Sequence, residues 1–423
     1  MRCLPRAPIP RILLALCTAL VSACAVAADP PPEYDAAFHA ELLPAEGAAV
    51  ASVKIDQRDG EVSELRFRIE EGRHHDFDGD GELEVEPPFV YWRPPADGGR
   101  FSLRVHIDRE RRGNGKDAHI DADWAILRLD HLFPAARVRG RPGATSRSTL
   151  SLAAPEDWSV ETRYGRFDGE PLPVETSGRR YSRPTGWIAA GQLGVRRESI
   201  AGRGVTVVGP VQQGVRRMDH LALMQWTLPT LLEVFPAFPE SVLVVSAGDP
   251  MWRGALSGPS SLYIHAERPL INERGTSTLL HELVHVAGIS GTGTGAAWIV
   301  EGLADYYSLE ALRRSGAVTD ARHERSRAAL ERQGRDVSRL DTRRANAEVS
   351  ARAVTVLYML DAAIRDASGG EANLDDVARA LAESDETITL ARFRTLAEQT
   401  AGATLALFDD LPLRKPAPPS RIE

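Results

Sequence analysis

The amino-acid sequence predicts an α+β protein in which an N-terminal antiparallel β-sandwich precedes a mainly helical domain. From about residue 48 to residue 208, short segments such as LRFRI, FVYWR and FSLRVHI alternate apolar with polar residues, and Gly, Pro, Asp and Asn separate them. A period of two is typical of antiparallel strands that bury one face. From about residue 216 apolar residues recur every three or four positions, as in MDHLALMQWTLPTLLEVF, which indicates helices.

The change of pattern predicts a domain border near residue 208. We expect a β-rich domain over residues 29–208 and a helical domain over 209–411, with a small sheet from the strands SVLVVSA and SSLYIHA. Residues 412–423, which contain KPAPPSRIE, are expected to form a disordered tail because they are rich in Pro and polar residues.

Residues 1–28 have the pattern of a bacterial secretory signal, with three arginines before an apolar run and small residues after it. The run is shorter than the roughly 20 apolar residues that a membrane span requires. We therefore expect an exported protein with two alternatives. Cleavage near Ala28 would give a periplasmic protein, whereas Val-Ser-Ala before Cys24 resembles a lipobox and would give an outer-membrane lipoprotein, held at the membrane only by its lipid.

Composition and charge exclude some classes of protein. The chain has 51 Lys plus Arg against 59 Asp plus Glu, a formal net charge of -8, and loss of the arginine-containing leader makes it more negative. A nucleic-acid partner is therefore not expected. All three cysteines lie in the leader, so the folded part has no disulfide and depends on packing for its stability.

The segment HELVH carries the clearest chemical pattern. Because His281 and His285 are four residues apart, a helix places both imidazoles on one face, one turn apart. Two ring nitrogens at that spacing suit the roughly 2 Å Zn–N bonds of a tetrahedral site. Glu282 is rotated by about 100° from His281, where it can reach a metal-bound water without binding the metal. The alternative is that both histidines are ordinary core residues.

A catalytic zinc needs a third protein ligand and an open position for water. Glu301, sixteen residues after His285, lies in WIVEGLADYY, which reads as a second helix. The intervening GISGTGTG predicts a turn that folds this helix back on the first. Asp305 lies one turn beyond Glu301 and is expected to accept a hydrogen bond from the far nitrogen of a ligand histidine. The predicted site holds one Zn²⁺ ion.

These motifs resemble those of the gluzincins, zinc peptidases that share HExxH followed downstream by a ligand glutamate in an E-G-x-x-D/E context. Within that group the chain is most similar to the bacterial glycyl aminopeptidase family. The similarity rests on HELVH, EGLADYY and LDAAIRDASGGEANLDDVARAL, and it extends from about residue 210 to residue 410.

The resemblance implies a thermolysin-like catalytic domain that hydrolyses peptide bonds in peptide or protein substrates. His281, His285 and Glu301 would be the zinc ligands, Glu282 the general base, and Asp305 the residue that orients a ligand histidine. The rival hypothesis is a catalytically weakened, zinc-binding adaptor protein of the cell envelope. An intact Glu282 argues against the adaptor, because a purely structural zinc site has no use for a base.

Two features depart from the family. Its aminopeptidases carry a Gly-Gly-x-Glu-His strand whose acid holds the α-ammonium group of the substrate. This chain has GPSSLYIHAERPL in that region, where Glu267 is the only substitute. Relatives also place a tyrosine where this chain has Ser350 and Ala351. The resemblance therefore does not by itself imply that the protein recognises the N-terminus of a substrate.

Two further predictions concern the bound substrate. The strand SSLYIHA is expected to pair with an extended peptide through its edge. Tyr358 is the nearest candidate to stabilise the oxyanion, with Tyr306 and His265 as other candidates. The alternative for Tyr358 is a packing role in the apolar face of its helix.

A weaker motif, DFDGDGELEVE, spaces Asp76, Asp78 and Asp80 as in the opening of a calcium loop. Position twelve, where a bidentate glutamate belongs, is Pro87. Acidic, glycine-rich turns are common without calcium, so a solvated turn is preferred over a Ca²⁺ site.

Overall fold

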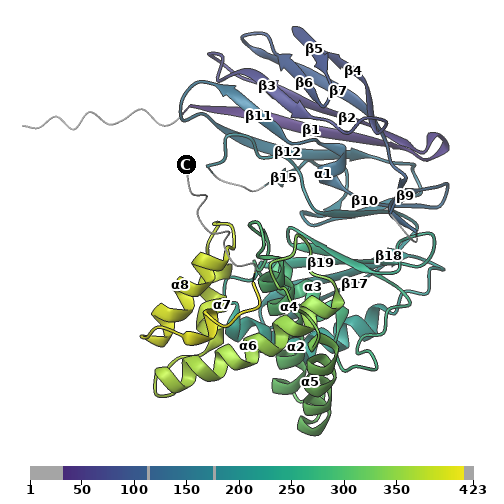
Figure 1. Cartoon of the computed structure of the whole chain (residues 1–423). Coiled ribbons are helices and arrows are strands. Elements are labelled where there is room, and N and C mark those ends of the chain that lie inside the picture. Colours follow the sequence, from purple (N-terminus) through teal and green to yellow (C-terminus); the bar gives the residue numbers. More distant parts are fainter. Residues whose placement is uncertain (1–31, 112–114, 175–177, 414–423) are drawn as a thin grey trace, which may run out of the picture.

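A computed structural model describes residues 32–111, 115–174 and 178–413 of the chain. The predicted leader with Cys24 and residues 414–423 of the predicted tail lie outside this part. Figure 1 shows a sheet-rich N-terminal half above a C-terminal half of one sheet and several helices. The α+β class predicted from the sequence is therefore confirmed.

Three sheets form the N-terminal half. The first sheet has the order β15 (Leu172–Val174), β12 (Thr145–Ala153), β1 (Glu33–Leu43), β2 (Ala48–Asp56), β7 (Gly98–His106), β4 (His74–Gly79). The second has the order β11 (Ala136–Gly140), β3 (Val62–Arg68), β6 (Phe89–Arg93), β5 (Glu82–Glu86). The third has the order β14 (Gly165–Phe167), β13 (Ser159–Thr162), β16 (Trp187–Gly191), β10 (Trp124–Arg128), β9 (Lys116–Ile120), β8 (Arg109–Glu110).

This half differs from the predicted two-sheet antiparallel sandwich. Its three sheets share one apolar core, and β1 pairs with β12 in parallel, from Glu33 opposite Thr145 to Glu41 opposite Ala153. The alternating burial of β6, which is the segment FVYWR, and of β7, which contains FSLRVH, agrees with the predicted period of two. Periodicity reports which face is buried and carries no information about the direction of a partner more than 100 residues away.

The C-terminal half contains a five-stranded sheet in the order β17 (Leu193–Ile200), β18 (Arg203–Pro210), β19 (Ser241–Ala247), β21 (Ser261–His265), β20 (Ala255–Gly258). β18, β19 and β21 are parallel, and β20 pairs antiparallel with β21 at the edge. Because β17 and β18 belong to this sheet, the structural border lies before residue 193, whereas the sequence pattern had placed it at residue 208.

The five-stranded sheet is buried on both faces, which explains the continuous apolar run SVLVVSA of β19. Val242 and Val244 face a core shared with the helices, whereas Leu243 and Val245 face the third N-terminal sheet. On that second face Trp187 and its neighbours pack against Tyr263. An apolar seam therefore joins the two halves of the molecule.

Helices surround the other face of this sheet and form the lower part of the molecule (Figure 1). These helices are α2 (Arg217–Val234), α3 (Thr278–Val286), α4 (Ala297–Arg314), α5 (Asp320–Gly334), α6 (Ala347–Ala367), α7 (Leu374–Ala382) and α8 (Leu390–Ala401). The short helix α1 (Leu129–Leu132) instead packs in the apolar core of the N-terminal half. Two 3₁₀ turns span Pro44–Glu46 and Ala406–Phe408. No helix in the described part of the chain is long and apolar enough to cross a membrane.

Candidate metal centre

Helix α3 carries the HELVH segment and is set by local signals at both ends. The Ser277 side chain caps its N-terminus by accepting a hydrogen bond from the amide of Leu280. Its apolar residues are buried, whereas His281 and His285 remain partly exposed on the remaining face. After the helix, Gly288 has a φ of 114°, and a Cβ there would come within 2.6 Å of the carbonyl oxygen of Ala382. Glycine is therefore required for the turn out of α3.

Helix α4 returns beside α3 and carries Glu301 and Asp305. The Ser308 hydroxyl group accepts a hydrogen bond from the amide of Ser277 and donates one to the carbonyl of the same residue. These two bonds join the middle of α4 to the start of α3. The antiparallel return that the glycine-rich segment predicted is therefore present in the structure.

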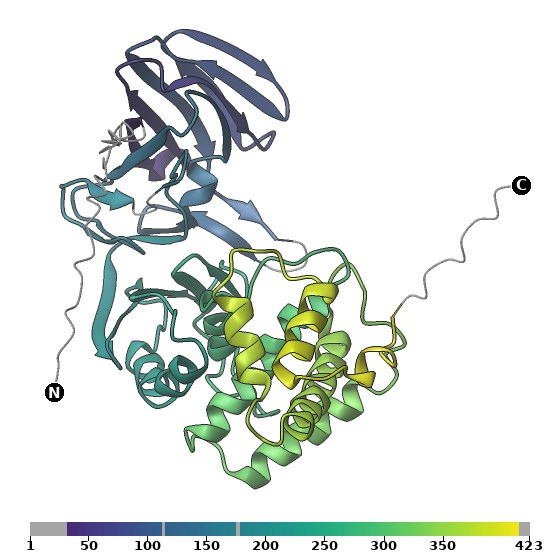
Figure 2. The ribbon, with the colours of Figure 1, turned by 90° about the vertical axis from the view of Figure 1, so that its left-hand side faces the viewer.

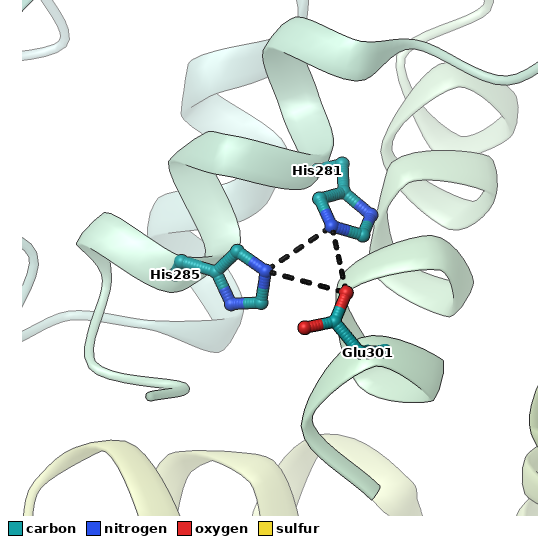
Figure 3. Close-up of side chains that lie close together, drawn as sticks. All are labelled: His281, His285 and Glu301. Carbon is teal, nitrogen blue, oxygen red and sulfur yellow. Dashed lines mark hydrogen bonds and ion pairs between the residues drawn. The ribbon is translucent and has the colours of Figure 1, made fainter. Parts of the chain in front are cut away.

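His281, His285 and Glu301 converge on one point between these helices (Figure 3). The Nε2 atoms of the two histidines are 3.1 Å apart, and Oε2 of Glu301 lies 3.3 Å from Nε2 of His281 and 4.0 Å from Nε2 of His285. Ligands at about 2.0–2.1 Å from a tetrahedral zinc are separated by about 3.3 Å. The three separations therefore fit a single zinc ion.

The opposite edges of both rings are held by hydrogen-bond acceptors. Nδ1 of His281 is 2.8 Å from Oδ1 of Asp305, and Nδ1 of His285 is 2.7 Å from the carbonyl oxygen of Ile289. Because a carboxylate and a carbonyl can only accept, both Nδ1 atoms carry the hydrogen. In neutral rings both Nε2 atoms then direct lone pairs at each other and at Glu301. This arrangement is unfavourable unless a cation lies between them.

The same geometry changes the proton affinities of the cluster. Burial alone would lower the pKa of His281, but the nearby carboxylates of Asp305 and Glu301 outweigh it and raise that pKa well above the usual value. Burial would raise the pKa of Glu301, but hydrogen bonding to His281 and the charge of His285 lower it. Both shifts favour a positively charged His281 ring beside a negatively charged Glu301 carboxylate in the metal-free protein.

A cavity of about 220 Å³ opens beside the cluster, and we call it the α3 pocket. Its lining includes His281, Glu282 and Asp305. Glu282 is only 7% exposed, and its side chain forms no hydrogen bond or ion pair with another described residue. A buried carboxylate without a partner that lines a pocket is suited to accept a proton from a bound water.

A zinc ion at this cluster would retain an open position. Within the described ranges, His281, His285 and Glu301 form the only group of three or more His, Cys, Asp and Glu side chains whose ligand atoms are close enough to share a metal ion, all within 4.8 Å of one another. No fourth such ligand from these ranges joins it. Catalytic zinc sites have three protein ligands and keep the fourth position for water.

The three candidates for the oxyanion donor lie elsewhere. Tyr358 donates a hydrogen bond to Oε1 of Glu310 and is 2.9 Å from Nε2 of His323. The ring of Tyr306 packs against that of Tyr358, and His265 is 1% exposed. None of the three lines the α3 pocket. The packing alternative for Tyr358 is thus closer to its observed environment.

Two other expectations, and the calcium alternative that the sequence disfavoured, also find no support in the geometry. Glu267 is exposed and lies 2.6 Å from Nη1 of Arg253, outside the α3 pocket. Asp76, Asp78 and Asp80 occupy the β4–β5 region without gathering their oxygens at one point, so the structure contains no preformed calcium site there. The strand SSLYIHA is β21, whose two edges are already paired with β19 and β20.

The open edge of the sheet and part of the pocket wall were not predicted from the sequence. The edge strand is β20, whose Ala255 lines the α3 pocket together with Trp252 and Arg268. The segment ALSG is short and does not alternate, so no periodic signal marked it as a strand. Gly254 just before it lies under the Trp252 ring, because a Cβ there would come within 2.2 Å of that ring.

No protein-family model matches the chain, and no curated protein is significantly similar to it in sequence. Solved structures do match in fold. An aminopeptidase N family protein from Idiomarina loihiensis aligns with a TM-score of 0.61 and 14% identity, over 87% of this chain and 71% of that chain. A variant of an M1 zinc metallopeptidase from Deinococcus radiodurans aligns with a TM-score of 0.58 and 16% identity, over 91% and 95%. The chain therefore shares the fold of M1 zinc metallopeptidases.

Proposed function

We propose that this protein is an exported zinc metallopeptidase of the gluzincin type. The observation that carries the proposal is the convergence of His281, His285 and Glu301, whose acceptor atoms face one another, beside the unpaired carboxylate of Glu282. The fold shared with two zinc peptidases supports it. Bound zinc would supply a water of lowered pKa and a positive charge next to the scissile carbonyl group.

The residues of the chain would share the remaining work. Glu282 would take the proton of the attacking water on its carboxylate and deliver it to the leaving amine. Asp305 would keep the hydrogen of His281 on Nδ1, which leaves Nε2 free to bind metal. An extended peptide would pair with the free edge of β20, because that strand contributes Ala255 to the pocket that contains Glu282.

The replacement Glu282→Gln tests this assignment. It removes the proton acceptor but none of the proposed ligands, so zinc stoichiometry should stay near one while peptide hydrolysis falls by roughly 10²–10⁴-fold. Metal analysis and a peptide-library assay with and without chelator measure the two effects. Glu348→Gln, at an exposed position of α6, should leave both unchanged. Hydrolysis by Glu282→Gln at the native rate would remove Glu282 from the mechanism.

We further propose that cleavage does not require a free α-amino group. Among its described lining residues, the α3 pocket has no acid besides Glu282 and Asp305, and both have other tasks. N-acetylated and free forms of the same peptide should therefore be cleaved at similar rates. Strict dependence on the free amine would indicate an aminopeptidase instead.

Export remains part of the proposal and rests on residues 1–28. The intact mass of the mature protein distinguishes the two locations. A chain that begins at acylated Cys24 would be an outer-membrane lipoprotein. An unmodified N-terminus near Ala28 would indicate a periplasmic protein.

A further inference from the structure

Arginines from three separate segments line the α3 pocket or a second cavity that shares a contact with its wall. Arg268 lines the α3 pocket, as do Trp252 and Glu282. The guanidinium group of Arg111 stacks on the Trp252 ring, with its central carbon 3.7 Å from the ring centroid. Trp252 thus contacts Arg111 from the N-terminal half and lines the same pocket as Arg268.

Arg111 belongs to the segment that follows β8, which reaches the C-terminal half (Figure 2). Two backbone hydrogen bonds fix this approach. The amide of Lys116 donates to the carbonyl of Pro250, and the amide of Trp252 donates to the carbonyl of Lys116. The position of Arg111 relative to the pocket wall is therefore set by main-chain pairing.

A second cavity, of about 500 Å³, continues on the Arg111 side of this wall and is lined by Arg109, Glu110, Arg111, Asp117 and Arg344. Arg109 is already within 4 Å of Glu70 and Asp117. In contrast, neither Arg111 nor Arg344 has a carboxylate within 4 Å in the described ranges. Arg344 is exposed and lies in the segment that leads into α6.

Arg268, Arg111 and Arg344, which we call the arginine rim, have no carboxylate partners among the described residues. Arg268 lines the α3 pocket, Arg111 and Arg344 line the second cavity, and Arg111 stacks on Trp252 of the α3 pocket. Guanidinium groups bind carboxylates through paired hydrogen bonds. The chain as a whole is acidic, with a net charge of -8. Its overall field repels acidic peptides, so any attraction of them must come from this local group.

We propose that the arginine rim selects peptides that carry carboxylate groups beside the bond to be cleaved. The inference deepens the proposed peptidase function and rests on it for the cleavage step. The binding step is independent of cleavage. Two sources of the carboxylate are available, namely an Asp or Glu side chain and the C-terminus of the peptide.

Binding to the non-hydrolysing variant Glu282→Gln tests the inference directly. The probes are fluorescent peptides of Ala, Gly and Leu with two internal Asp residues or two internal Asn residues, each with a free or an amidated C-terminus. We expect the Asp peptide to bind roughly threefold to thirtyfold more tightly than its Asn counterpart at low salt, with the difference reduced by added salt. A preference that follows the free C-terminus alone would assign the rim to terminal carboxylates.

Further variants in the Glu282→Gln background locate the effect. Arg344→Gln and Arg268→Gln should each reduce the Asp-over-Asn ratio, and the combination should bring it close to one. Arg343→Gln, at an adjacent exposed arginine that lines neither cavity, should preserve the ratio. Equal binding of all four peptides, no binding of any, or a ratio that survives both rim replacements would overturn the inference.

Hydrolysis of the Asn peptides by the native protein separates this inference from the proposed function. Cleavage without a preference for carboxylates would contradict only the role of the rim. Tight, rim-dependent binding without cleavage of any peptide would contradict only the peptidase assignment.

Discussion

Helix α4 contributes to two clusters of histidine and carboxylate, and their difference shows what distinguishes a metal site from a structural network. The front cluster contains Glu301 and Asp305 with His281 and His285. The back cluster is centred on Glu310, nine residues further along the helix and about 14 Å away along its axis. The side chains of His281 and Glu301 in the front cluster are 19% and 39% exposed, whereas those of His323 and Glu310 in the back cluster are 3% and 5% exposed.

Both carboxylate oxygens of Glu310, at the centre of the back cluster, have hydrogen-bond donors. Oε1 of Glu310 accepts a hydrogen bond from Tyr358 and is 3.1 Å from Nε2 of His323, while Oε2 accepts from Arg313 and Arg314. Burial opposes ionisation, but the hydrogen bonds from His323 and Arg313 outweigh it and hold the pKa of Glu310 well below its usual value. The cluster is complete without any added ion.

The front cluster lacks such donors. The Nδ1–H groups of its two rings donate to Asp305 and to the carbonyl of Ile289. When the rings are neutral, both Nε2 atoms are therefore acceptors, and they face each other at the centre of the cluster. The comparison suggests a simple criterion. A buried carboxylate–histidine cluster that satisfies itself is structural, and one whose acceptors face one another requires a cation.

The largest expected effect is on metal content. His281→Ala removes a proposed ligand, so zinc stoichiometry should fall from about one to near zero and hydrolysis should be lost. His323→Ala in the back cluster should keep its zinc. Metal analysis of both folded variants makes the comparison, and equal zinc loss in both would show that the two clusters do not differ as described.

A smaller effect is expected from the carboxylates behind the histidines. Asp305→Asn weakens the acceptor that orients His281, so zinc affinity should fall by about 10–100-fold. The matched variant Asp375→Asn, whose side chain contacts Arg314 and Tyr307, should not change it. Competition with a chelator of known affinity measures both values. Unchanged affinity in Asp305→Asn would indicate that the ring is held by other contacts.

The pH dependence of zinc binding should also distinguish the front cluster. The pKa of His281 is raised, so the metal-free protein keeps its proton at pH values where a free imidazole has lost it. Zinc must displace this proton, and its affinity should weaken by about tenfold for each unit by which the pH falls below that pKa. Calorimetry in buffers of different ionisation enthalpy would detect the released proton. A dissociation constant independent of pH would contradict the assignment.

Tyr358→Phe should leave the zinc content unchanged. It leaves Glu310 and His323 without one hydrogen-bonding partner and should lower the free energy of unfolding by about 1–3 kcal/mol. Urea unfolding, zinc content and kcat should be measured together. A hundredfold loss of kcat with unchanged stability would instead restore Tyr358 as the oxyanion donor.

The geometry of the front cluster was largely predictable because it depends on short-range rules. A spacing of four places His281 and His285 on one face, and a glycine-rich turn returns Glu301 to them. The direction of Tyr358 was not predictable, because it depends on how closely α6 approaches α4. Gly302 permits that approach, since a Cβ there would come within 2.6 Å of the Cβ of Ala353.

The sequence predicted that the N-terminal half contains strands, but not which strands pair with each other. Alternation identified many strands of the β-rich half, yet the parallel pairing of β1 with β12 joins segments that lie far apart in the sequence. The short edge strand β20 carries no periodic signal, although it borders the α3 pocket. Long-range pairing and pocket walls are set by tertiary contacts, which local patterns do not encode.

The seam around Trp187 and Tyr263 limits how the two halves could be exchanged during evolution. A gene fragment starting at residue 209 would lose β17 and all but the last two residues of β18 and would leave β19 as an unprotected parallel edge with one bare apolar face. Such a fragment would be prone to edge-to-edge aggregation. The two halves therefore cannot be separated without loss. The N-terminal half covers one apolar face of the five-stranded sheet, and its Arg111 packs on Trp252 in the wall of the α3 pocket.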